Sequence, residues 1–169
     1  MTVRPLRYLG DPLLRSEADP VMRFDAALGR LIEDLLDTVR EPDRAGLAAN
    51  QIGSSLAAFA YNVEGKLGYL VNPRIIELEG DQDGLEGCLS VPGVTALRRR
   101  AARAVVTGVN LDREQVTISG EDELARCFQH EVDHLHGELY IDKLDADERR
   151  RVLRQINAER LAGDSGLRG

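Results

Sequence analysis

The chain has 169 residues, of which 43% are hydrophobic and 30% charged, as is typical of one globular domain with a sizeable core. The net charge of −7 argues against nucleic acid as the main partner, because affinity for phosphate backbones depends on Lys and Arg. The sequence contains no apolar run long enough to span a bilayer, and its N-terminal stretch lacks the apolar segment of a secretory signal. We therefore expect a cytoplasmic protein without a membrane partner.

The first predicted element is an amphipathic helix over residues 24–41. Its apolar residues recur at helical spacing, Asp25 is a suitable N-cap, and Pro42 stops the helix. The stretch 43–110 is rich in β-favouring residues broken by Gly, Asn and Pro, and a further alternating segment follows it. Strands are therefore expected at residues 56–63, 67–80, 103–111 and 115–119.

A second helix is expected to begin near Glu121 and to end at Gly137, and it carries all three histidines. Residues 138–144 are expected to be extended, and residues 145–163 return to helical spacing. The last residues, 164–169, are expected to be disordered. This order of elements predicts an α+β fold in a single domain spanning the whole chain. Short, mostly antiparallel sheets would surround the central helix, with an N-terminal and a C-terminal helix outside them.

The central helix contains the segment HExxH. His130 and His134 are four residues apart, so they share one helical face and can present two nitrogens to one metal ion. Glu131 can reach a water on that ion as a general base. The alternative is a solvated polar helix, but apolar residues on several sides of the segment favour a buried helix, where histidines need partners. His136 does not share this face, so it is placed outside the ligand set.

A third metal ligand must come from another part of the chain. Cys88 lies in the turn-like segment LEGCLSVPG, and a thiolate is a strong ligand for zinc and ferrous iron. Gly87 would let the backbone approach such a site closely. The alternative, a small buried hydrophobe, is the preferred interpretation of Cys127, which has apolar neighbours in a helix. Gln51 offers an amide suited to an oxyanion, although alone it is more simply an exposed residue of a tight loop.

Three segments together resemble the ordered motifs of the peptide deformylase family. They are GLAANQ at 46–51, EGCLS at 86–90 and QHEVDHL at 129–135. The resemblance also covers the first helix, the VNP strand at 71–73 and the C-terminal helix, which is nearly the whole chain. It implies a metal-dependent hydrolase that removes the formyl group from the N-terminal formyl-methionine of new polypeptides and releases formate.

The resemblance also implies roles for individual residues. Three side chains would hold one divalent metal ion, Fe²⁺ or Zn²⁺, with a water in the fourth position: Cys88, His130 and His134. Glu131 would take a proton from that water and deliver it to the leaving amine, while Gln51 and the backbone N–H of Leu89 would stabilise the oxyanion. The implied partner is a formylated nascent polypeptide or a similar N-formyl substrate. The enzyme is expected to be a monomer that could contact the ribosome transiently.

Some positions depart from the family pattern. Where its first motif opens with Gly, an apolar residue and Gly, this chain has Arg44, Ala45 and Gly46. Glu123 and Arg126 stand at positions that resemble the lining of the methionine pocket. These two charges could pair on the helix and face solvent, or they could reshape the pocket. The residues expected to contact substrate are Ala45, Gly46, Gly87, Arg100, Glu123 and Arg126.

The sequence leaves three functions open. The first is a deformylase that acts on formyl-methionyl polypeptides. The second is a hydrolase of the same fold that acts on another N-formyl or N-acyl substrate. The third is a non-catalytic metal-binding protein of that fold. Glu131 and Gln51 argue against the third function, because a structural metal site needs neither residue.

Overall fold

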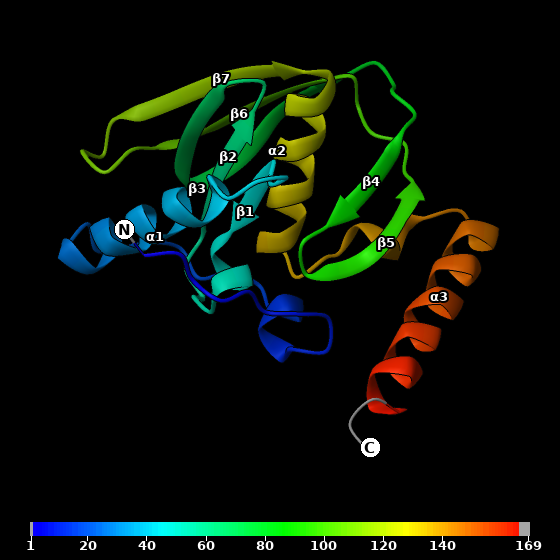
Figure 1. The fold of residues 1–169 in the computed structure, drawn as a ribbon. Coiled ribbons are helices and arrows are strands. Elements are labelled where there is room, and N and C mark those ends of the chain that lie inside the picture. The colour runs from blue at the N-terminus through cyan, green and yellow to red at the C-terminus, as the bar shows by residue number, and fades with distance from the viewer. Residues whose placement is uncertain (1, 166–169) are drawn as a thin grey trace.

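The computed structural model describes residues 2–165, and its central element is helix α2 (Asp122–Leu135), which lies between two sheets (Figure 1). The larger sheet has five strands in the order β1-β2-β3-β6-β7, and the smaller one is the hairpin of β4 and β5. The strands are β1 (Gly46–Ala48), β2 (Ala58–Val63), β3 (Lys66–Glu79), β4 (Leu85–Cys88), β5 (Val91–Leu97), β6 (Arg103–Val109) and β7 (Gln115–Glu121). Every strand pair within these sheets is antiparallel, so the predicted α+β fold is confirmed.

The first helix, α1 (Ala26–Val39), forms where the apolar spacing predicts it. The Asp25 side chain caps the helix by accepting a hydrogen bond from the Leu28 N–H at 3.0 Å. Its buried face packs into a core shared with β1 and β2. The residues of that face are Leu28, Ile32, Leu35 and Val39.

Helix α2 approaches the five-stranded sheet closely because β7 has a glycine at the contact. A Cβ on Gly120 would lie 2.8 Å from Leu124 Cγ and 2.9 Å from Phe128 Cε2, closer than such atoms can come. Leu124 and Phe128 instead enter a core that includes Phe59 of β2. One face of α2 is thereby fixed against the large sheet, and Figure 1 shows the β4–β5 hairpin on its other side.

The segment after α2 differs from the extended chain that its sequence predicts. Gly137 has a positive φ of +72° and follows the helix end as expected, but residues Tyr140–Lys143 form a 3₁₀ helix, η3. The Asp142 side chain accepts a hydrogen bond from the Leu139 N–H at 2.8 Å and so closes this turn. The extended prediction for 138–144 is therefore wrong, because a local side-chain cap outweighs the β-favouring residues.

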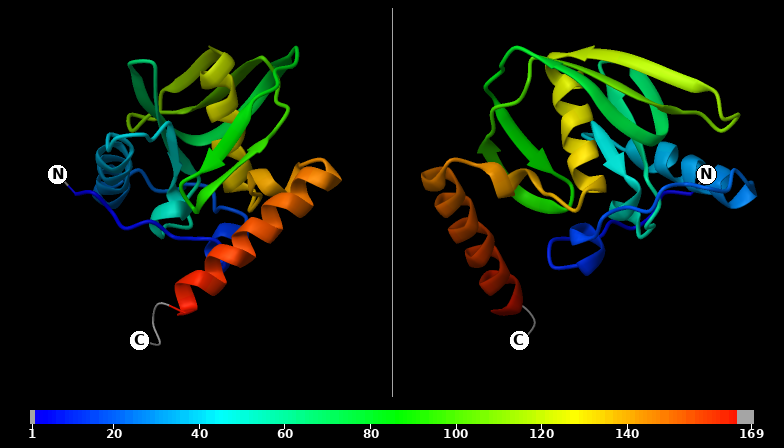
Figure 2. Two further views of the ribbon diagram at one scale, coloured as in Figure 1. Left: turned by 45° about the vertical axis from the view of Figure 1, so that its right-hand side comes forward. Right: turned by 180° about the vertical axis from the view of Figure 1, so that it is seen from behind.

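The C-terminal helix α3 (Ala146–Ser165) packs against β5, at the opposite side of the molecule from α1 (Figure 2). Val152 and Ile156 are its buried residues in the core beneath that hairpin. Residues 164 and 165 are helical rather than disordered, and the rest of that prediction falls on residues 166–169, outside the described part of the chain. Within residues 2–165, no helix combines the length and the apolar character that a membrane crossing requires.

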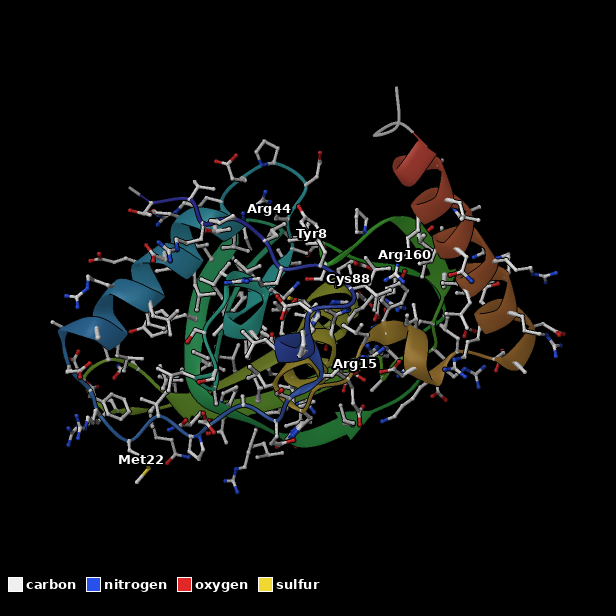
Figure 3. The ribbon with its side chains drawn as sticks, turned by 90° about the horizontal axis from the view of Figure 1, so that it is seen from below. Tyr8, Arg15, Met22, Arg44, Cys88 and Arg160 are labelled. Carbon is white, nitrogen blue, oxygen red and sulfur yellow. The ribbon has the colours of Figure 1, made fainter. Side chains whose placement is uncertain are left out.

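The N-terminal segment crosses the molecule on the side seen in Figure 3, which labels Tyr8 and Cys88. It contains the 3₁₀ helix η1 (Pro12–Arg15). The Arg7 N–H donates to the Gln51 carbonyl at 2.7 Å, and the Leu9 N–H donates to the Ser90 carbonyl at 2.8 Å. The segment therefore ties the 3₁₀ helix η2 (Ala49–Ile52) to the β4–β5 turn.

Candidate active site

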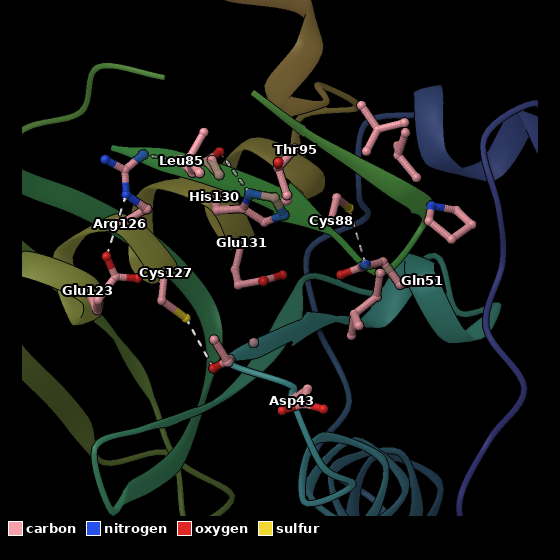
Figure 4. Close-up of a pocket in the computed structure, with 18 of the residues that line it drawn as sticks. Asp43, Gln51, Leu85, Cys88, Thr95, Glu123, Arg126, Cys127, His130 and Glu131 are labelled. Atoms are coloured by element: carbon pink, nitrogen blue, oxygen red, sulfur yellow. Dashed lines mark hydrogen bonds and ion pairs between the residues drawn. The ribbon is translucent and has the colours of Figure 1, made fainter. Parts of the chain in front are cut away.

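A cavity of about 510 Å³ lies beside α2 (Figure 4). Its walls come from β1 and η2, from the β4–β5 hairpin and from α2. Each of the three motif segments found in the sequence contributes residues to these walls. The fold thus collects at one cavity the residues that the sequence singles out.

Cys88, at the end of β4, faces the two imidazoles of α2. Its Sγ is 3.2 Å from His134 Nε2, which is itself 3.2 Å from His130 Nε2. The three atoms lie within 4.8 Å of one another, and both imidazoles are buried. A thiol and two imidazoles are ligands that zinc and ferrous iron both accept. The geometry therefore fits one divalent metal ion at this point.

The carboxylate of Glu86 orients the first imidazole. His130 Nδ1 is 2.9 Å from Glu86 Oε2, so the ring turns its Nε2 toward the other ligand atoms. Arg100 holds the same carboxylate through two bonds, Nε to Oε1 at 2.9 Å and Nη2 to Oε2 at 2.7 Å. Burial alone would raise the pKa of Glu86, but the hydrogen bonds from Arg100 and His130 outweigh it and hold the pKa well below its usual range. Glu86 is therefore a permanent anion behind the site.

The second imidazole is kept neutral by its surroundings. Burial lowers the pKa of His134 well below the usual value, and His130 lowers it further. A neutral ring keeps the lone pair that metal binding requires. The backbone at this position is also fixed, because Asn50 Nδ2 of η2 donates to the His134 carbonyl at 2.7 Å.

Glu131 lies on the wall of the same cavity. Its side chain is buried, and burial raises its pKa to about 7. Its Oε2 has no hydrogen-bond partner within the described residues. A Cβ on Gly46 would lie 2.5 Å from Glu131 Oε1, so glycine leaves the room that this carboxyl occupies. A carboxyl with a pKa near neutrality can both accept and return a proton.

Gln51 is buried rather than exposed, so the simpler interpretation of its sequence context is wrong. Its Oε1 accepts a hydrogen bond from the Ala48 N–H at 2.9 Å. Its Nε2 lies 3.1 Å from Ser90 Oγ and 3.8 Å from Cys88 Sγ, which aims the amide N–H₂ at the metal ligands (Figure 4). Leu89 follows Cys88 and also lines the cavity.

Five of the six residues expected to contact substrate line this cavity: Ala45, Gly46, Gly87, Glu123 and Arg126. Arg100 does not line it. Its side chain is buried in ion pairs with Glu86 and Asp133, each at 2.7 Å. The expectation that Arg100 lies beside the substrate is therefore wrong here. Its Nε, Nη1 and Nη2 each donate to one of these two carboxylates.

Glu123 and Arg126 do not both face solvent. The side chain of Arg126 is only 5% exposed, whereas that of Glu123 is 64% exposed. Their closest charged atoms are 3.9 Å apart, too far for a hydrogen bond. The solvent-facing interpretation therefore holds for Glu123 and fails for Arg126.

The remaining thiol and imidazole lie outside the ligand set, as the sequence indicates. Cys127 is buried, burial raises the pKa of its thiol well above the usual value, and its Sγ donates to the Ala45 carbonyl at 3.4 Å. His136 is exposed and lies 2.8 Å from Glu17. Sequence reasoning gave no role to Glu86, although its place in the EGCLS motif was a signal. The role of the Ser90 hydroxyl depends on the fold, because it accepts a hydrogen bond from Gln51 Nε2 at 3.1 Å.

A thiol and two imidazoles beside a carboxyl group and an amide define an active site of the metallohydrolase type. The sequence profile of the family described as Polypeptide deformylase matches residues 3–150. The chain is 50% identical to a protein named peptide deformylase from Acidothermus cellulolyticus, covering 98% of this chain and 92% of that one. The crystal structure of a peptide deformylase from Legionella pneumophila superposes with a TM-score of 0.88 at 37% identity, covering 96% and 98% of the two chains. A peptide deformylase structure from Thermus thermophilus gives a TM-score of 0.87 at 38% identity, covering 98% and 100%.

The chain therefore belongs to the polypeptide deformylase family and is an enzyme. The likeness extends over nearly the full length of these relatives rather than over the motifs alone.

Proposed function

We propose that this enzyme removes the formyl group from the N-terminus of formyl-methionyl polypeptides and releases formate. The observation that carries the proposal is the position of Glu131, whose pKa is raised to about 7 in a cavity shared with Cys88 and the two imidazoles. Such a carboxyl group is suited to moving a proton during hydrolysis of a small amide. Membership of the deformylase family supports formylated peptides as the substrate.

One divalent metal ion, Fe²⁺ or Zn²⁺, would be held by Cys88, His130 and His134. When bound, the ion would act as a Lewis acid and make water acidic enough to lose a proton near neutral pH. The donor set supports this assignment, because Glu86 holds the His130 imidazole with its Nε2 turned toward the other two ligand atoms. A structural zinc site would usually add a fourth protein ligand, whereas three such residues group here within the described chain.

Different residues of the chain would then carry out proton transfer and stabilise the developing charge. Glu131 would accept a proton from the attacking water and return it to the amine that leaves. Gln51 Nε2 would donate a hydrogen bond to the formyl oxygen as negative charge develops on it, together with the N–H of Leu89. Gln51 Oε1 accepts a hydrogen bond from the Ala48 N–H and its Nε2 donates to Ser90 Oγ, so the amide is held in place beforehand and little reorganisation is needed.

The proposal is tested by formate release from a formyl-Met-Ala-Ser peptide, using protein loaded with Fe²⁺ under anaerobic conditions. Glu131→Ala should lower kcat by about 10²–10⁴-fold, the range typical of general acid–base catalysis. The variant should still bind one equivalent of metal, as measured by elemental analysis. Glu114→Ala, at an exposed position between β6 and β7, is the matched control and should keep full activity.

Unchanged kcat in Glu131→Ala would contradict the assigned role of this carboxyl group. A wild-type protein that holds its metal but releases no formate from any formyl peptide would contradict the proposed function itself. That outcome would favour the non-catalytic alternative on the same fold.

A further inference from the structure

The inference concerns Asn50, a residue of the 3₁₀ helix η2 that is buried but does not line the active-site cavity. Its side-chain Nδ2 donates to the His134 carbonyl at 2.7 Å. A carbonyl oxygen can only accept a hydrogen bond, so this contact decides which end of the amide faces α2. Gln51 follows directly in η2, so one short helix carries both the proposed oxyanion donor and a bond to the backbone of a proposed metal ligand.

The two imidazoles of the proposed metal site are held in different ways. The ring of His130 is held directly, because its Nδ1 is 2.9 Å from Glu86 Oε2. The ring of His134 has no such bond, because its Nδ1 is buried and has no hydrogen-bond partner within residues 2–165. A metal-bound imidazole almost always donates its other ring N–H, and that bond orients the ring. The orientation of His134 therefore depends on its packing and on the position of its backbone.

The backbone of His134 lies in the last turn of α2, where a helix is held least firmly. The last four carbonyls of a helix have no partner within it, and His134 is the last residue but one. The Gly137 N–H reaches this carbonyl at 3.0 Å, but Gly137 belongs to the turn that leaves the helix. Asn50 comes from a separate element, so its bond holds the end of α2 from outside the helix.

We propose that Asn50 is a positioning residue of the metal site. Its amide holds His134 through the backbone, whereas His130 is held through its ring. The inference rests on the proposed metal site and adds to it a residue that contacts neither the ion nor the substrate. Without the amide, the last turn of α2 is released and His134 moves more freely relative to Cys88. Metal affinity then falls by about 10–100-fold, the loss that is typical when a group behind a metal ligand is removed.

The experiment measures the dissociation constant for Zn²⁺ by chelator competition on metal-free protein, in the absence of any formyl peptide. Asn50→Leu keeps the branched shape of the side chain but removes both ends of the amide. The His134 carbonyl keeps its bond from the Gly137 N–H, and the buried Oδ1 of Asn50, which has no partner among the described residues, is removed as well. The cost in stability should therefore be small, while metal binding should weaken.

Thr38→Val is the matched control for the loss of a buried hydrogen bond. Thr38 of α1 is fully buried outside the cavity, and its Oγ1 accepts a hydrogen bond from the Arg4 N–H at 2.9 Å. Valine has the shape of threonine without the hydroxyl group. The control should bind Zn²⁺ like the wild type, even where urea denaturation of the metal-free proteins shows an equal or larger loss of stability. The dissociation constant of Asn50→Leu should be at least tenfold higher than that of the control.

Asn50→Ala is the second variant, in case leucine is not accommodated at this buried position. Alanine needs less space than asparagine, and the loss of one hydrogen bond is small beside the stability of a typical domain, so this variant should fold. It also lacks the amide donor. Its dissociation constant for Zn²⁺ should likewise be at least tenfold higher than that of Thr38→Val.

The inference is wrong if every Asn50 variant that folds has a dissociation constant less than tenfold above that of Thr38→Val. In that case the bond to His134 is a packing contact only. A wild type that binds no Zn²⁺ would overturn the inference together with the proposed metal site. A wild type that binds Zn²⁺ but, loaded with Fe²⁺, releases no formate contradicts the proposed deformylation alone, and the comparison of the variants then still decides the role of Asn50.

Discussion

The two sides of the active-site cavity differ in how completely their polar groups are paired. On the metal side, the Glu86 carboxylate accepts bonds from Arg100, Arg126 and His130. Gln51 on the same side uses both ends of its amide. The part of the wall at the start of α2 is the one expected to contact substrate, and we call it the substrate wall. There Glu123 is exposed, and two donors of the Arg126 guanidinium have no partner among the described residues.

This difference matches two tasks expected of the cavity, catalysis on the metal side and contact with substrate at the other wall. Catalytic groups must be held in place before substrate arrives, which requires neighbours that already satisfy their hydrogen bonds. A wall that only contacts substrate does not need its donors to be paired in this way. The metal side should therefore be sensitive to any change, while the substrate wall should tolerate change but alter selectivity.

The largest effect is expected at Glu86, the anion that joins the two sides. Glu86→Ala leaves Arg100 and Arg126 buried without their shared carboxylate. Breaking a buried ion pair in this way costs about 3–5 kcal/mol of unfolding free energy. Loss of the bond to His130 should also weaken metal affinity by about 10–100-fold. Urea denaturation and metal competition measure the two effects.

Glu79→Ala is the control for this prediction. Glu79 is also paired with an arginine, Arg103 at 3.2 Å, but its side chain is 60% exposed. An exposed pair is worth about 0–1 kcal/mol, so the control should unfold nearly like the wild type. Equal losses of stability in the two variants would show that the buried network is not what holds the metal side together.

A smaller effect is expected at Gly46, where β1 meets the Glu131 carboxyl group. In Gly46→Ala, the new Cβ would lie 2.5 Å from Glu131 Oε1 and 2.7 Å from Cys127 Sγ, so one of them must move. Overpacking of this kind costs about 1–3 kcal/mol in stability, and displacement of Glu131 should lower kcat by more than tenfold. Formate release and thermal unfolding measure both consequences.

Gly29→Ala is the matched substitution outside the cavity. Gly29 lies in α1, and a Cβ there would meet no atom within 4 Å. Alanine is favoured over glycine within a helix by about 1 kcal/mol, so this variant should be slightly more stable and fully active. Full activity in Gly46→Ala as well would contradict a tight fit around Glu131.

The sequence predicts the metal side far better than the substrate wall, for a physical reason. The proposed ligands on α2 are recognisable because helical spacing places His130 and His134 on one face. The Asp25 cap and Gly137 likewise follow local rules. Resemblance to a known motif then indicates Cys88. These features depend on short stretches of chain.

The partners of Arg126 cannot be predicted from short stretches of sequence. Its bonds to Glu86 and to the Arg98 carbonyl span 40 and 28 residues, and no periodic pattern in the sequence indicates them. The space for its guanidinium depends on Gly84, in another segment of the chain, because a Cβ there would lie 3.1 Å from Arg126 Nη2. Arg100 shows the same limitation, because it lies next to two other arginines and only the fold shows which one enters the buried network.

The smallest effect is expected where Glu148 of α3 contacts the end of β5. Glu148 accepts hydrogen bonds from Arg151 and from the Leu97 N–H, and these bonds lower its pKa to about 2. Because the pKa is lower in the folded state, its contribution to stability is complete above the usual value near 4.5. That contribution is lost as the pH falls toward 2.

Glu148→Gln should therefore unfold at a slightly lower temperature than the wild type at pH 6, and the difference should vanish near pH 2. Thermal unfolding of both proteins across this range tests the expectation. Kinetics at neutral pH should be unchanged, because Glu148 does not line the cavity. A stability difference that persists at pH 2 would mean that the loss in Glu148→Gln comes from altered packing rather than from the charge on the carboxylate. A loss of kcat at neutral pH would show that the positions of the groups on the metal side also depend on α3.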